Sequence, residues 1–173
     1  MKTKFFILMG VAGSGKTTIG KVLAAKLGWD FYDADNFHPP ENITRMASGI
    51  PLNDHDRAPW LDKLHALISS CLKEDRPGVL ACSALKEHYR KILLTGNSGV
   101  RIVFLKADYD LIKKRMITRS GHYMKPEMLE SQFEALDEPV NGLVIDASLP
   151  VDEIVNRILD NSTNSITERK GFL

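Results

Sequence analysis

The chain has 173 residues, a length that suits a single domain able to bury a sizeable core. Hydrophobic residues make up 43% of it and charged residues 26%, which is ordinary for a globular protein and argues against disorder of the whole chain. The formal net charge of +1 provides no electrostatic basis for binding nucleic acid or a membrane surface. We therefore expect any anion to be bound by a local group of residues.

The sequence carries no sign of secretion or membrane insertion. Its N-terminal apolar run is short and is not followed by a cleavable small-residue site, and no other stretch approaches the length of a membrane span. The two cysteines, Cys71 and Cys82, do not form a CxxC pair, which fits reduced and mostly packed thiols. These features predict a cytoplasmic protein.

An eight-residue string near the N-terminus is the strongest signal in the chain. It fits G-x-x-x-x-G-K-[ST] and lies between an apolar run and a helical pattern, which is the context that this phosphate-binding motif needs. Its glycines keep Cβ atoms out of a tight turn, so that backbone N–H groups can point at phosphate oxygens. The lysine is predicted to reach the β and γ phosphates, and the threonine hydroxyl to ligate Mg²⁺. The predicted nucleotide-binding residues of this loop are Gly10, Val11, Ala12, Gly13, Ser14, Gly15, Lys16 and Thr17.

Two strands are predicted on either side of the first helix. An apolar strand over residues 4–9 leads into the phosphate loop, and a second strand over residues 29–33 ends in the string D-A-D. Because parallel α/β sheets bind ligands beyond the carboxyl ends of their strands, both carboxylates are expected on the rim that holds the phosphate loop. Asp33 is a candidate to hold Mg²⁺ or a substrate hydroxyl, whereas Asp35 or Asn36 could instead form a turn or cap a helix.

A polar segment after the second strand is predicted to carry function. A short helix is expected to open at residue 38 and to run through residue 46. The loop over residues 49–57 is rich in turn formers and longer than a simple connector, as functional loops often are. The next helix is predicted to begin at Asp56, with Pro59 tolerated in its first turn and Trp60 in the core.

The third predicted strand, residues 79–82, is not followed by an aspartate, so the usual Walker B position is empty. The second magnesium ligand must then come from elsewhere, with Asp33 or Asp35 as candidates. A helix over about residues 86–94 and an apolar strand over residues 101–106 follow.

A basic helix and the loop after it are predicted to form a lid. The helix covers residues 108–119, and its two neighbouring lysines are explained by the favourable placement of positive charge near a helix C-terminus. Arg115 and Arg119 share one face of this helix and lead into a hinge-like loop over residues 120–126. We expect this segment to bring positive charge to a bound nucleotide.

Five strands alternate with helices along the chain, which predicts a parallel sheet covered by helices on both faces. The expected fold is therefore α/β, the three-layer α/β/α architecture of P-loop NTPases, with about five parallel strands and a mobile lid as in nucleoside monophosphate kinases. The last three predicted elements are a helix over residues 126–136, a strand over residues 143–145 and an amphipathic helix over residues 151–159.

We expect one kinase domain over residues 1–160 and a polar tail over residues 161–173, where apolar periodicity is lost. Within the domain, the segment from about 36 to 58 is the predicted substrate loop and the segment from about 119 to 127 the predicted lid.

Three functions compete for a phosphate-loop domain of this size: a small-molecule kinase, a GTP-dependent switch and a nucleotide-binding regulatory module. A switch needs a guanine-recognising N-K-x-D motif, which the sequence lacks, and its D-x-x-G string at residues 75–78 enters a strand instead of leaving one. A regulatory module does not need a second set of charged groups on the rim of the sheet that holds the phosphate loop. This sequence is expected to place such a set there. The sequence therefore favours a kinase.

The phosphate acceptor must be inferred from the groups opposite the phosphate loop. An arginine pairs bidentately with a carboxylate, so Arg45 or Arg57 suggests an acidic acceptor, while polar partners such as Asp35 and His38 suit hydroxyls. These residues indicate a polyhydroxy acid or a nucleoside monophosphate and do not choose between them.

Strings along nearly the whole chain, to about Pro139, resemble the gluconate kinase (gluconokinase) family, a relative of shikimate kinase within the nucleoside monophosphate kinase group. The most specific are P-L-N-D-H-D-R-A-P-W-L at residues 51–61 and C-S-A-L-K-E-H-Y-R at residues 82–90. Ala34 and Tyr123 depart from the usual glycine and phenylalanine of relatives. The other matching strings are residues 10–17, 33–39, 42–46, 49–50, 121–122 and 131–134.

The resemblance implies ATP-dependent phosphorylation of D-gluconate at its terminal hydroxyl, giving 6-phosphogluconate and ADP, commonly by a homodimer. The alternative is a related kinase that acts on another hydroxy acid, such as shikimate or idonate, or on a nucleoside monophosphate. Lys86 is expected to serve the acceptor or the phosphate, or else to pair with Glu87, and no function is favoured for Arg90.

The mechanistic hypothesis assigns each candidate a role. Asp33 orients or deprotonates the attacking hydroxyl, and Arg119 closes from the lid onto the charge of the transferring group. The catalytic candidates are thus Lys16, Asp33 and Arg119; Arg115 joins the phosphate loop in binding nucleotide; Thr17 and Asp33 hold Mg²⁺; and Asp35, His38, Arg45, Arg57, Lys86 and His122 bind substrate.

Overall fold

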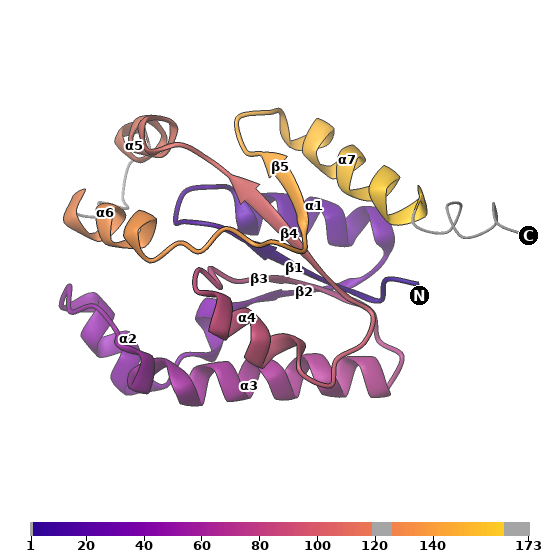
Figure 1. Ribbon diagram of the computed structural model, residues 1–173, viewed down its shortest axis with the longest axis horizontal. Helices are drawn as coiled ribbons and strands as arrows, with labels where there is room; N and C mark the ends of the chain where they lie inside the picture. Colours follow the sequence, from indigo (N-terminus) through magenta and orange to yellow (C-terminus); the bar gives the residue numbers. More distant parts are fainter. Residues whose placement is uncertain (1, 119–125, 165–173) are drawn as a thin grey trace, which may run out of the picture.

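The computed structural model describes residues 2–118 and 126–164 (Figure 1). In this part of the chain a single sheet of five parallel strands has the order β2-β3-β1-β4-β5. This order places β1, which carries the phosphate loop, in the middle of the sheet, next to β3 and β4. The strands are β1 (Phe5–Met9), β2 (Asp30–Asp33), β3 (Gly78–Ala81), β4 (Val100–Lys106) and β5 (Leu143–Asp146).

Helices cover both faces of the sheet, which confirms the predicted three-layer α/β/α fold (Figure 1). One face is covered by α1 (Lys16–Leu27) and α7 (Val151–Asn164), and the other by α3 (Asp54–Lys73) and α4 (Glu87–Leu94). Beyond the carboxyl edge of the strands lie α2 (Pro40–Ala47), α5 (Tyr109–Thr118), α6 (Pro126–Glu134) and the 3-10 helix η1 (Ala34–Phe37).

The alternation of side chains along β1 explains the two hydrophobic cores. Phe5, Ile7 and Met9 point to the face covered by α3 and α4, where they join Trp60 in one buried cluster, and the intervening residues point to the α1 and α7 face. A strand buried on both faces reads as a continuous apolar run, which is why this strand could be predicted. None of the helices in the described ranges is long and apolar enough to cross a membrane.

The start of α3 corrects the prediction for the substrate loop. The helix begins at Asp54 instead of Asp56, because Asn53 and Asp56 form a reciprocal capping box in which each side chain accepts a hydrogen bond from the other's backbone N–H. Residues 54–57 of the loop predicted over residues 49–57 are therefore helical, and Pro59 lies inside the helix instead of in its first turn.

The end of α7 corrects the predicted start of the tail. The helix continues through Asn164, beyond the last apolar position that the periodicity marked, so residues 161–164 are not part of an irregular segment. Polar side chains support this last turn, since Asn161 donates to the Arg157 carbonyl at 2.9 Å and Ser162 donates to the Leu159 carbonyl at 2.6 Å. The rest of the predicted tail lies outside the described residues.

Candidate active site

The phosphate loop turns tightly between β1 and α1, and its backbone needs glycine. Gly10 has a φ of +148°, and a Cβ atom there would lie 2.9 Å from the carbonyl oxygen of Leu105. Gly15, with a φ of +100°, is the N-cap of α1, which begins at Lys16. Because side chains are excluded from these positions, main-chain groups line the turn, as a phosphate cradle requires.

Lys16 is folded back onto this loop. Its Nζ atom donates to the carbonyl oxygens of Gly10 and Val11, each at 2.9 Å. Burial lowers the pKa of Lys16, while the negative charges of Asp35 and Asp33 oppose that shift. A phosphate bound in the loop would favour the charged lysine in the same way, so the side chain is placed to exchange carbonyl partners for phosphate oxygens.

Asp33, at the carboxyl end of β2, reaches the first turn of α1. The Thr17 hydroxyl donates to its Oδ2 atom at 2.9 Å, and the Asp35 N–H donates to its Oδ1 atom at 3.2 Å. The second bond makes Asp33 the N-cap of η1, the role that the sequence had left to Asp35 or Asn36. One carboxylate thus joins the strand rim to the phosphate-loop helix.

The oxygen atoms of Thr17 and Asp33 suit Mg²⁺, a hard cation that is usually held by one or two carboxylates together with substrate phosphates and water. Within residues 2–118 and 126–164, no group of three or more His, Cys, Asp or Glu side chains could form a dedicated metal cage. The Thr17 and Asp33 oxygens fit part of the ligand set of an ion that is also held by phosphate oxygens and water.

A cavity of about 760 Å³, here called the phosphate-loop cavity, opens in front of these groups. His38 forms part of its wall and stacks on Trp60, with ring centroids 4.5 Å apart and planes 8° apart. Burial lowers the pKa of His38, which favours a neutral imidazole, and burial raises the pKa of Cys82 to about 12, which keeps that thiol protonated. Other lining residues are Lys16, Thr17, Asp33, Asp35 and Ser83.

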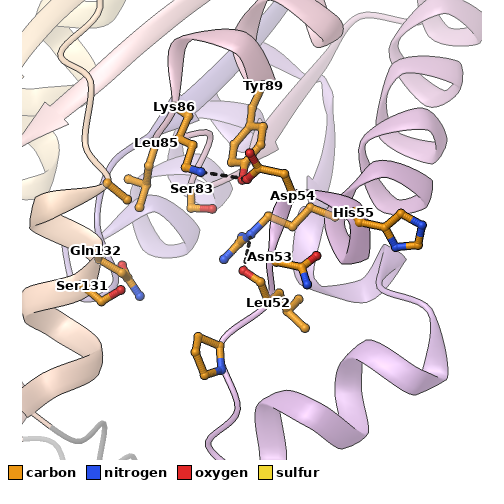
Figure 2. Close-up of a pocket in the computed structure, with 13 residues that line it drawn as sticks. Leu52, Asn53, Asp54, His55, Ser83, Leu85, Lys86, Tyr89, Ser131 and Gln132 are labelled. Atoms are coloured by element: carbon orange, nitrogen blue, oxygen red, sulfur yellow. Dashed lines mark hydrogen bonds and ion pairs between the residues drawn. The ribbon is translucent and has the colours of Figure 1, made fainter.

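A second cavity of about 600 Å³, here called the Lys86 cavity, adjoins the first (Figure 2). In its wall the Asp54 carboxylate accepts hydrogen bonds from Lys86 Nζ at 2.8 Å and from the Tyr89 hydroxyl at 2.5 Å. These bonds, the one from Lys86 first, hold the pKa of Asp54 below its ordinary value. Lys86 therefore does not pair with Glu87, which instead forms an ion pair with Lys91 at 2.9 Å.

The two candidate arginines occupy different places. Arg57 lines both cavities, where its Nε atom donates to the Leu52 carbonyl at 3.3 Å and its guanidinium lies 5.8 Å from the ring centroid of Tyr89. Arg45 lies 3.6 Å from the Asp56 carboxylate and is not among the residues that line either cavity in the described chain. The geometry therefore favours Arg57 as a ligand for an anionic acceptor.

Arg115 joins the phosphate loop to the segment that follows β5. Its guanidinium donates to the Ala147 carbonyl at 2.6 Å and, more weakly, to the carbonyls of Gly13 and Ser14 at 3.4 and 3.5 Å. The side chain thus lies against the loop that would hold the nucleotide phosphates, and its role in binding nucleotide stays a prediction from the sequence.

Most of the predicted lid lies outside the described residues. Arg119 and His122 fall between the end of α5 at Thr118 and the start of α6 at Pro126. Their roles stay predictions from the sequence.

Comparison with known proteins decides among the kinase families. The profile of the shikimate kinase family matches residues 12–163. The thermosensitive gluconokinase of Escherichia coli K12 is 48% identical over 139 residues, which cover 80% of this chain and 74% of the relative. The probable gluconokinase of Mus musculus is 45% identical over 150 residues, covering 77% of this chain and 82% of the relative. The chain belongs to the gluconokinase family.

A solved structure extends this relationship to the fold. The crystal structure of a gluconokinase from Sinorhizobium meliloti 1021 superposes with a TM-score of 0.85 at 36% identity, and the match covers 98% of this chain and 99% of the other. The gluconokinase family resemblance expected from the sequence strings is therefore confirmed at the level of both sequence and architecture.

Four residues of this gluconokinase-family site were not singled out from the sequence: Asp54, Ser83, Tyr89 and Gln132. Asp54 did carry a signal, because the capping box around it makes it the first residue of α3 and so places it at the carboxyl edge. Gln132 belongs to the matching string over residues 131–134, but the resemblance assigned it no role.

Proposed function

We propose that this chain transfers the γ-phosphoryl group of ATP to the terminal hydroxyl of D-gluconate, giving 6-phospho-D-gluconate and ADP. The observation that carries the proposal is the pair of adjoining cavities, one built on a phosphate loop and the other on paired charged groups, with Arg57 in the wall of both. The names of the gluconokinase relatives support gluconate as the acceptor.

On the donor side, the main-chain N–H groups of the phosphate loop and Lys16 bind the triphosphate, and Arg115 supports the loop from α5. Thr17 and Asp33 would hold Mg²⁺ against it. When bound, this ion neutralises charge on the phosphate oxygens.

On the acceptor side, Arg57 binds the gluconate carboxylate, because a guanidinium fork matches a carboxylate bidentately. Asp35, His38 and Lys86 face the hydroxyls of the sugar chain from the cavity walls. Arg45 and His122 rank lower as substrate-binding residues in this proposal. Arg45 lies outside the linings of both described cavities, and His122 lies outside the described residues.

In the transfer step, the terminal hydroxyl of gluconate gives its proton to Asp33 while its oxygen bonds to the γ-phosphorus and the bond to the β,γ-bridging oxygen breaks. Phosphoryl transfer depends on positioning and charge neutralisation more than on covalent chemistry by the protein. Arg119, carried by a lid over residues 119–127, completes the neutralisation in this proposal. A cytoplasmic homodimer is the form in which we expect the chain to act.

An acceptor panel tests the proposed function. With ATP and Mg²⁺, ADP formation should be fast with gluconate and far slower with idonate, shikimate, AMP or CMP. A coupled ADP assay measures each rate, and phosphorus NMR of the gluconate product should place the new phosphate on the terminal carbon. Strong turnover of shikimate or of a nucleotide, with none of gluconate, would establish the alternative kinase instead.

A further inference from the structure

One hydrogen bond joins the phosphate loop to a helix from the far end of the sequence. The backbone N–H of Ala12 donates to the Oε1 atom of Gln132 at 2.7 Å. Gln132 belongs to α6, which lies beyond the carboxyl edge of the sheet and follows the predicted lid (Figure 1). The phosphate loop, which binds ATP in the proposed function, is thus hydrogen-bonded to α6, a helix that also lines the Lys86 cavity.

The chemistry of the bond fixes how the glutamine side chain is turned. An N–H group can donate only to the carboxamide oxygen, so Oε1 is the end that lies on the phosphate loop. Two other loop amides donate to backbone carbonyls: the Ser14 N–H to that of Val11 within the loop and the Gly10 N–H to that of Ser83 beyond β3, both at 3.3 Å. The Ala12 amide donates instead to a side chain, that of Gln132.

Apolar packing sets both partners in place. Leu129, one turn before Gln132 on α6, is buried in a small cluster with Val11, the residue before Ala12. Ile112 of α5 completes the contact. The hydrogen bond therefore joins two segments that are also packed together through their apolar side chains.

This contact lies where the two cavities meet. Gln132 and its neighbour Ser131 are the α6 residues that line both the phosphate-loop cavity and the Lys86 cavity. In Figure 2 these two side chains lie across the Lys86 cavity from Asn53 and Asp54. A shift of α6 would change the width of the passage between donor and acceptor.

We propose that Gln132 is a positioning residue for phosphoryl transfer: through the Ala12 amide it sets α6 against the phosphate loop and so aligns the acceptor with the donor. The inference rests on the proposed function. Reacting atoms must be held about 3 to 3.5 Å apart, and a misplacement of about 1 Å costs about 100-fold in rate.

The test variant is Gln132→Met, which keeps the length of the side chain and removes the hydrogen-bond acceptor. We expect kcat with gluconate to fall about 10- to 100-fold. The KM for ATP and the slow hydrolysis of ATP by water without gluconate should change little, because neither needs an aligned acceptor. Glu130→Gln, at an exposed position on the same helix, is the matched control and should behave as the unmodified enzyme.

A spectroscopic arm follows the contact itself. In protein labelled with ¹⁵N-alanine, the Ala12 amide proton should move upfield in Gln132→Met, because it loses a short hydrogen bond, and should stay in place in Glu130→Gln. An unchanged kcat, an equal fall in gluconate turnover and water hydrolysis, or an unmoved Ala12 signal would each overturn the proposal. If the unmodified enzyme does not act on gluconate, the proposed function fails, while the Ala12 signal still tests the contact.

Discussion

Replacing Asp33 by asparagine is expected to lower kcat with gluconate by about 10²- to 10⁴-fold, the usual contribution of a positioned general base. Asparagine has nearly the same shape and can still accept the hydrogen bond from Thr17, so the strand end and the first turn of α1 should keep their geometry. The variant loses the negative charge that takes the proton of the attacking hydroxyl and that helps to hold Mg²⁺.

Steady-state kinetics over a range of Mg²⁺ concentrations measure this effect. Asp30→Asn is the matched control, because Asp30 begins the same strand at the opposite edge of the sheet and pairs there with Arg76 at 3.7 Å. That variant should keep the activity of the unmodified enzyme. Full activity of Asp33→Asn would show that the proton has another acceptor.

Replacing Arg57 by alanine is expected to raise the KM for gluconate by about 10- to 150-fold. This range corresponds to about 1.5 to 3 kcal/mol, the usual value of hydrogen bonds to a charged group. The KM for ATP should change little, since the phosphate loop and Lys16 bind the donor. The KM of Arg57→Lys for gluconate should lie between those of the unmodified enzyme and of Arg57→Ala, because lysine keeps the charge and loses the bidentate fork.

Arg45→Ala is the comparison variant for the KM measurement on Arg57→Ala. Arg45 pairs with Asp56 and lies outside the linings of both described cavities, so its replacement should raise the gluconate KM far less than that of Arg57. A larger effect from Arg45 would reassign the carboxylate to that residue and move the acceptor toward α2.

The parts that the sequence could predict are those coded by neighbouring residues. The phosphate loop is one contiguous string, and β1 is one continuous apolar run, so motif and periodicity were sufficient to place both. The alternation of strands and helices then determined the layers. The start of α3 was misplaced because turn-forming residues also form capping boxes, and the helix gains two hydrogen bonds by beginning at Asp54.

The contacts that could not be predicted join residues far apart in the chain. Asp54 meets Lys86 across 32 positions, and Ala12 meets Gln132 across 120. Nothing in local spacing encodes such pairs, because they depend on how α3, α4 and α6 pack at the carboxyl edge. Arg90 is a different case, because its contacts are close in sequence: its buried guanidinium donates to the carbonyls of residues 84 and 85, in the turn before α4.

The central claim is that the two adjoining cavities bring a triphosphate and a sugar acid together at Asp33. A crystal structure with Mg²⁺, a non-hydrolysable ATP analogue and gluconate tests this most directly. We expect the triphosphate in the phosphate loop, the gluconate carboxylate on Arg57, and the terminal hydroxyl between Asp33 and the γ-phosphate. Gluconate bound with its terminal hydroxyl far from the γ-phosphate, or outside both cavities, would contradict the account.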